Sequence, residues 1–119
     1  WAIWSEGSSY WKNATGYINI SGLPDLSNLK GLQIPVAWTS NVKPYTTPVL
    51  KVYTGTSGYG DVLRINETLP FIINDTTNNQ KLCVYTVSGW SGTKMKITFT
   101  SDYPVWWNGW GQNSMELYY

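Results

Sequence analysis

Histidine is absent from this sequence, and cysteine occurs only once, as Cys83. Without histidine the chain lacks the usual general base, the Ser–His and Cys–His nucleophile pairs, and imidazole metal ligands. One cysteine can build neither an internal disulfide framework nor a zinc cage. The simplest interpretation of Cys83 is a small buried hydrophobe within a strand. We therefore expect no enzyme, no metal site and no cofactor.

Charged residues are also scarce, at 13% of the chain with a net charge of +1. Most of the seven carboxylates fall in predicted turns, where backbone chemistry explains them, so we expect no facing pair for glycoside hydrolysis. No basic field is available for nucleic acid. No apolar run approaches the roughly 20 residues of a membrane-spanning helix. Because the chain begins at Trp1, we expect a secreted protein whose signal peptide has been removed.

Aromatic and β-branched residues are plentiful, and they favour strands. The alternation is clearest at residues 94–100, where Met95, Ile97 and Phe99 share one face. Pro35 cannot donate a ladder hydrogen bond, so its strand lies at an edge or pairs there on one side only. The pattern predicts an all-β fold, an immunoglobulin-like or jelly-roll-like β-sandwich with an N-terminal extension strand. The predicted strands of the sandwich are residues 32–38, 49–54, 61–66, 69–73, 81–87, 94–100, 105–107 and 115–119.

Residues 13–22 form the stretch around which we expect the chain to be organised. As a strand, this stretch would turn small and apolar side chains to one face, namely Ala14, Gly16, Ile18 and Ile20. The opposite face would be polar. Residues 1–12 precede it as a polar and aromatic leader without a sustained period. We expect residues 1–22 to be a tail with a candidate donor strand, and residues 23–119 to be the globular β-sandwich domain, with one short helical turn near residues 25–29.

Four glycosylation sequons are present, at Asn13, Asn19, Asn66 and Asn74. Asn13 and Asn19 fall on the polar face of the residue 13–22 strand. Asn66 is predicted to share a face with Arg64 in another strand. This placement favours an extracellular glycoprotein.

Eight tryptophans are the strongest chemical feature of the sequence. Trp38 fits the core by alternation, whereas Trp90 and Trp110 lie in glycine-rich turns where burial is harder to arrange. Exposed rings suit subunit interfaces, sugar faces or lipid headgroups. One alternative function is therefore a carbohydrate-binding module or lectin that stacks sugars on Trp90, Trp106, Trp107 or Trp110. A second alternative is a membrane-binding β-sandwich toxin that sets the residue 106–110 cluster, with Tyr118 and Tyr119, at the bilayer surface.

The plan of a tail strand followed by a sandwich resembles extracellular filament subunits assembled by donor-strand complementation. These include chaperone–usher pilins and the glycosylated thread filaments of archaea. The resemblance rests on the alternating Gly16, Ile18 and Ile20 after a polar leader, and on a final strand at residues 115–119 with Tyr118 beside its end. It covers about a fifth of the chain. Many bacterial pilins carry a paired-cysteine bridge, which the lone Cys83 cannot make.

The resemblance implies a globular part that lacks one strand and exposes an apolar groove. Residues 14–20 of a neighbouring copy would fill that groove by hydrogen bonding along its edge. The expected partners are then copies of the same chain in a homopolymer, together with surface glycans. The expected function is that of a structural subunit of a pilus or thread on the cell surface, with a role in cell adhesion.

Overall fold

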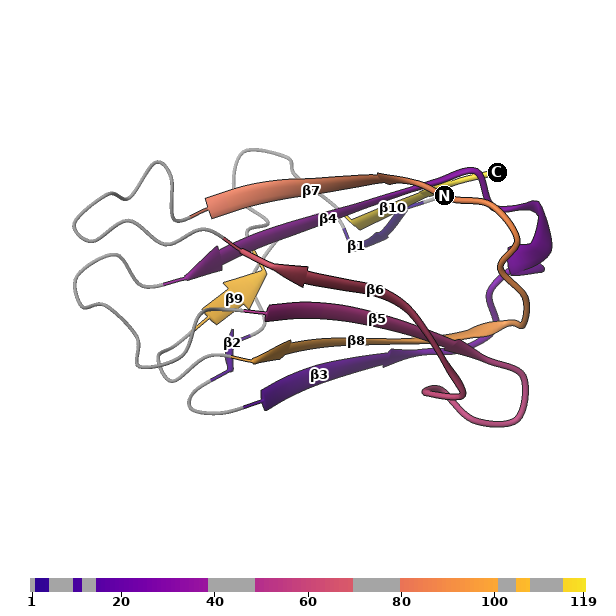
Figure 1. The fold of residues 1–119 in the computed structure, drawn as a ribbon, viewed down its shortest axis with the longest axis horizontal. Helices are drawn as coiled ribbons and strands as arrows, with labels where there is room; N and C mark the ends of the chain where they lie inside the picture. Colours follow the sequence, from indigo (N-terminus) through magenta and orange to yellow (C-terminus); the bar gives the residue numbers. More distant parts are fainter. Residues whose placement is uncertain are drawn as a thin grey trace.

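The computed structural model describes residues 2–4, 10–11, 15–38, 49–69, 80–100, 105–107 and 115–119. Within these ranges the chain forms two antiparallel sheets that face each other (Figure 1). The apolar side chains of both sheets meet between them in one buried cluster. The prediction of an all-β, sandwich-like architecture is confirmed.

The four-stranded sheet has the order β3–β8–β5–β6. Its strands are β3 (Thr15–Ile20), β8 (Lys94–Thr100), β5 (Val49–Gly55) and β6 (Val62–Thr68). Strands β8 and β5 are paired along their whole length. Their alternate residues are fully buried toward the other sheet, whereas the lysines between them are only half-buried. The inward residues of these two strands are Leu50, Val52, Thr54, Met95, Ile97 and Phe99.

The six-stranded sheet is built around β4 (Gly31–Trp38). Strand β7 (Gln80–Thr86) pairs with β4 on one side. On the other side β4 pairs with β10 (Met115–Tyr118) near its start and with β9 (Val105–Trp107) near its end. Two short N-terminal strands lie outside these, β1 (Ala2–Trp4) against β10 and β2 (Tyr10–Trp11) against β9.

Pro35 lies within β4, in the interval between the residues that pair with β10 and those that pair with β9. On the β7 side it is opposite Leu82. Proline has no backbone N–H, so this interval is where the central strand tolerates it. The second of the two predicted arrangements, pairing on one side only, is therefore what the described residues show.

One end of the sandwich is closed by the segment that follows β3. The short 3-10 helix η1 (Leu26–Asn28) is capped by Asp25, whose carboxylate accepts a hydrogen bond from the Ser27 amide at 2.9 Å. Hydrogen bonds from Ser27 lower the pKa of Asp25. Leucines recur every third residue across this turn and are buried in the core, at Leu23, Leu26 and Leu29. The predicted helical turn near residues 25–29 is confirmed as η1.

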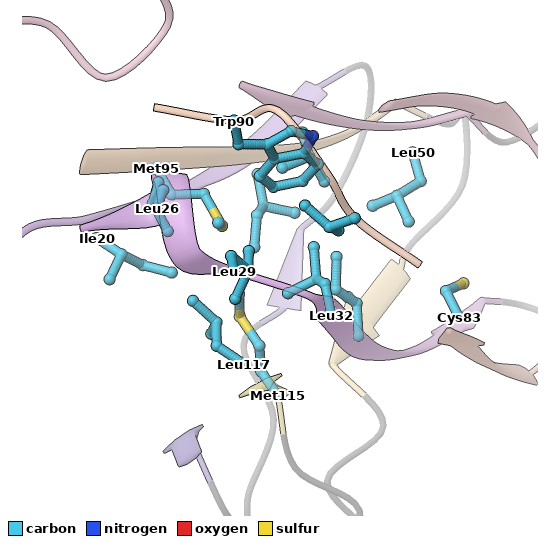
Figure 2. Packing of buried hydrophobic residues seen from close by; sticks show 14 of the residues in the cluster. Ile20, Leu26, Leu29, Leu32, Leu50, Cys83, Trp90, Met95, Met115 and Leu117 are labelled. Atoms are coloured by element: carbon cyan, nitrogen blue, oxygen red, sulfur yellow. The ribbon is translucent and has the colours of Figure 1, made fainter. Parts of the chain in front are cut away.

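Trp90, from the loop between β7 and β8, lies over the same end of the core, and only 8% of its surface is exposed. Figure 2 shows its ring among Met95, Leu26 and the neighbouring aliphatic side chains. The expectation that Trp90 is an exposed turn residue is therefore wrong. The reason lies in the backbone: the amides of Leu23 and Leu26 each donate, at 3.0 Å, to the carbonyls of Thr93 and Gly92, which draws the loop onto the core.

Candidate assembly strand

Strand β3 carries the residues predicted to mediate assembly. It pairs antiparallel with β8 in an unbroken register that runs from Thr15 opposite Thr100 to Ile20 opposite Met95. Ile20 is 9% exposed and belongs to the core, while its neighbour Asn19 is exposed on the opposite face. Gly16 and Ile18 belong to β3 by their backbones, whereas the side chain of Ile18 and the whole of Ala14 lie outside the part of the chain that the structure describes.

The place of β3 differs from the expected one in an important respect. The sandwich was expected to lack a strand and to expose a groove, yet in the single chain β3 occupies the edge of its own four-stranded sheet. The described parts of residues 1–20 are thus strands of the two sheets. The backbone groups of β8 are the physical reason, since they are satisfied by any strand of suitable register within reach, including the chain's own.

The link between β3 and the rest of the sandwich is short. Ser21 and Gly22 are exposed, and Gly22 has a φ of 70°. A Cβ placed on Gly22 would have nothing within 4 Å. The next residue, Leu23, is buried and hydrogen-bonded to Thr93. Residues 21–22 are therefore the only described step between the edge strand and the fixed end of the core, and they adopt a turn that favours glycine.

Two of the four sequons lie within the described residues. Asn19 on β3 and Asn66 on β6 are both exposed on the outer face of the four-stranded sheet, where Asn66 is opposite Lys51. Asn13 and Asn74 lie outside the described residues. Both of the described asparagines can therefore be reached by solvent.

Arg64 does not share a face with Asn66, contrary to the expectation. Along β6, Ile65 is opposite Val52 and Leu63 is opposite Tyr53, so Arg64 is an extra residue in a β-bulge. The bulge turns its guanidinium toward the closed end of the sandwich. There Nε donates to Thr54 Oγ1 at 2.9 Å, and the terminal nitrogens donate to Ser91 Oγ at 3.2 Å and to the Gly89 carbonyl at 3.5 Å.

A second side-chain hydrogen bond of β6 joins the two sheets. The hydroxyl of Tyr85, on β7, donates to the carboxylate of Glu67. Burial raises the pKa of Tyr85, and the adjacent Glu67 carboxylate raises it further. The sequence predicted neither the hydrogen bonds of Arg64 nor that between Tyr85 and Glu67, because a bulge and a contact between sheets leave no periodic signal along one strand.

The remaining aromatic candidates are only partly described. The backbones of Trp106 and Trp107 belong to β9, which pairs with β2 and β4, but their side chains and the whole of Trp110 lie outside the described residues. With Trp90 buried, the proposed tryptophan platform loses one of its members. The structure therefore adds nothing in favour of the lectin and toxin alternatives.

The chemistry of the described residues is otherwise sparse. Cys83 is fully buried in the core, as expected for a small hydrophobe. Within the described ranges no three His, Cys, Asp or Glu residues gather to hold a metal ion. A shallow hollow of about 370 Å³ lies beside η1, bounded by Asn28, Lys30, Ser88 and Tyr119, among others. None of the residues singled out from the sequence as a site lines it.

No helix in the described part of the chain has the length and hydropathy needed to cross a bilayer. Comparison with protein-family models, with curated proteins and with solved structures finds no match for this chain.

Proposed function

We propose that this protein is a structural subunit of an extracellular filament, and that it polymerises by passing strand β3 to a neighbouring copy. The observation that carries the proposal is the position of β3, an edge strand that among the described residues pairs with β8 alone. Since the chain's own β3 fills that edge, the proposed assembly step is an exchange, in which the same six residue pairs form between two molecules instead of within one.

The energetics of such an exchange are nearly balanced. Burying an isoleucine such as Ile20 contributes about 1.5–3 kcal/mol whether the surrounding core belongs to the same copy or to another. The ordering entropy of the strand is likewise lost in both cases. The balance is then set by the link at residues 21–22 and by new contacts between subunits. The positive φ of Gly22 makes this link the natural hinge.

The direction of exchange decides the product. A reciprocal exchange between two copies produces a closed dimer. If each copy instead gives β3 to the next copy, the β8 edge of the subunit at one end stays unpaired and the β3 strand of the subunit at the other end has no acceptor. The second pattern produces a filament. Glycans on Asn19 suit either product, because this side chain is on the outer face and stays exposed when the strand changes partners.

A pair of engineered cysteines tests the exchange directly. Asn19 and Lys96 are register partners on β3 and β8. In the double variant Asn19→Cys and Lys96→Cys, we expect a ladder of disulfide-linked oligomers on a non-reducing gel, and long filaments in electron micrographs of the unmodified protein. The matched control, Tyr53→Cys with Lys96→Cys, joins β5 to β8 and should link only within one molecule.

A clear negative result is also available. If the double variant at residues 19 and 96 yields only internally linked monomers at every protein concentration, β3 stays with its own sheet and the filament proposal fails.

A further inference from the structure

The outer face of the four-stranded sheet carries three lysines close together. Lys94 and Lys96 are two residues apart on β8 and so point to the same side. Lys51, on β5, is opposite Thr98 and therefore one diagonal step from Lys96. Diagonal neighbours of this kind are about 7–8 Å apart, and residues two apart on one strand are about 6.6 Å apart. We call Lys51, Lys94 and Lys96 the lysine patch.

Two members of the lysine patch, Lys94 and Lys96, lie over tyrosine rings. The Nζ of Lys96 lies 4.8 Å from the centre of the Tyr53 ring, and the Nζ of Lys94 lies 5.2 Å from the centre of the Tyr59 ring. Lys94 also donates to the carbonyl of Ser57 at 3.2 Å. These cation–π contacts restrict the lysine side chains without neutralising them. The charges of Lys94 and Lys96 are thus already ordered before any ligand arrives.

No carboxylate among the described residues pairs with the lysine patch. The nearest acidic group in the adjoining turn, Asp61, is engaged elsewhere, because its carboxylate accepts hydrogen bonds from the amides of Thr56 and Gly58 at 3.2 and 3.3 Å. Asp61 keeps its negative charge, so three lysines with this one carboxylate in the adjoining turn leave a local excess of positive charge, even though the net charge of the whole chain is only +1. The complementary ligand is a chain with repeated negative charges.

The tyrosine rings decide between classes of polyanion. Single-stranded nucleic acid binds through bases stacked on open aromatic faces. Here one face of Tyr53 and one of Tyr59 are covered by the protein's own ammonium groups. Lysines also act as point charges, without the planar fork with which arginine recognises phosphate. A carboxylated or sulfated sugar chain needs only an ordered row of point charges.

We propose that the outer face of the four-stranded sheet binds an anionic polysaccharide through Lys51, Lys94 and Lys96. The site does not depend on strand exchange, because all three lysines belong to β5 and β8, which stay together in every arrangement considered. Asn19 and Asn66 border the lysine patch, opposite Lys96 and Lys51 respectively. The test therefore uses the full chain produced in a host that adds no glycans.

The probes are dextran sulfate, polyglucuronate, neutral dextran and oligodeoxythymidine, with binding followed by biolayer interferometry. We expect saturable binding of at least one anionic polysaccharide, weakened by added salt, and no binding of neutral dextran. Replacing all three lysines by glutamine should weaken that binding by about tenfold or more. Whichever polysaccharide binds more tightly identifies the anionic group as sulfate or carboxylate.

Matched single variants control for net charge and folding. Lys96→Gln should weaken binding by about threefold, whereas Lys30→Gln, which removes an exposed charge just before β4 in the other sheet, should change it by less than about twofold. Thermal unfolding of each variant checks that it is folded. The proposal is overturned if neither anionic polysaccharide binds, if neutral dextran binds equally well, if oligodeoxythymidine binds more tightly than both, or if Lys30→Gln has as large an effect as Lys96→Gln.

Discussion

The two edge strands of the four-stranded sheet are held in different ways. Within the described ranges, strand β3 pairs with β8 alone and strand β6 pairs with β5 alone. The described side chains of β3 add only the burial of Ile20. Strand β6 adds Arg64, which reaches the loop between β7 and β8, and Glu67, which accepts from Tyr85 of the other sheet.

The difference indicates which edge can change partners. Releasing β6 would break side-chain hydrogen bonds to a second sheet and to a loop, and would leave a guanidinium and a carboxylate without their partners. As far as the described residues of β3 go, its release breaks a ladder and exposes the apolar surface of Ile20, and an identical strand restores both in full. We therefore expect exchange at β3 and none at β6.

The largest expected effect comes from breaking the core contact of β3. Ile20→Asp places a carboxylate where only 9% of the side chain is exposed, so we expect the free energy of unfolding to fall by about 3 kcal/mol or more. The variant should also form no filaments. Urea denaturation and electron microscopy provide the measurements.

Asn19→Asp is the matched control. It adds the same charge to the exposed face of the strand and should change the free energy of unfolding by less than about 0.5 kcal/mol. Equal losses in the two variants would show that Ile20 is not a core residue.

A smaller loss of stability is expected from removing the hydrogen bond between Tyr85 and Glu67 of β6. The pKa of Tyr85 is raised in the folded state, so its contribution to stability is complete below the pKa of an unfolded tyrosine, about 10, and declines as pH rises above it. Tyr85→Phe should lower stability at neutral pH by about 1 kcal/mol and should reduce the alkaline decline. Urea denaturation across pH 7 to about 11 measures both. Tyr53→Phe on the outer face is the control, and an unchanged alkaline slope in Tyr85→Phe would contradict the assigned hydrogen bond.

The sequence predicted the strands whose two faces have different environments. Residues 94–100 are the clearest case, since Met95, Ile97 and Phe99 are all buried whereas Lys94 and Lys96 are only half-buried. Apolar residues recur at every second position of a strand whenever one face is buried and the other is exposed to solvent. The same alternation contained Lys94 and Lys96 of the lysine patch. Lys51 joined them only through the register between β5 and β8, which sequence alone does not provide.

The features that were missed depend on contacts between distant segments. Trp90 was expected to be exposed because of the glycines beside it, yet hydrogen bonds to residues 23 and 26 bring its loop onto the core. Strands β1 and β2 are too short to show a period and exist through pairing with β10 and β9. The bulge inserts Arg64 as an extra residue in β6, so the Arg64 side chain is on the opposite face of the sheet from the one that simple alternation predicts.

The smallest and most specific effect is expected at the hinge of β3. Gly22 and Gly89 have φ values of 70° and 73°, and a Cβ at either would meet nothing within 4 Å, so alanine at each position should cost a similar amount, about 1 kcal/mol, through the backbone alone. Only Gly22 lies in the link that keeps β3 on its own sheet. Strain at Gly22 destabilises the monomer in which β3 pairs with its own sheet. If the link extends on exchange, this strain is relieved in the exchanged oligomer. About 1 kcal/mol then corresponds to roughly a fivefold shift of the equilibrium toward exchanged oligomers. Size-exclusion chromatography should therefore show more oligomer for Gly22→Ala than for Gly89→Ala at equal protein concentration, and identical profiles would place the hinge elsewhere.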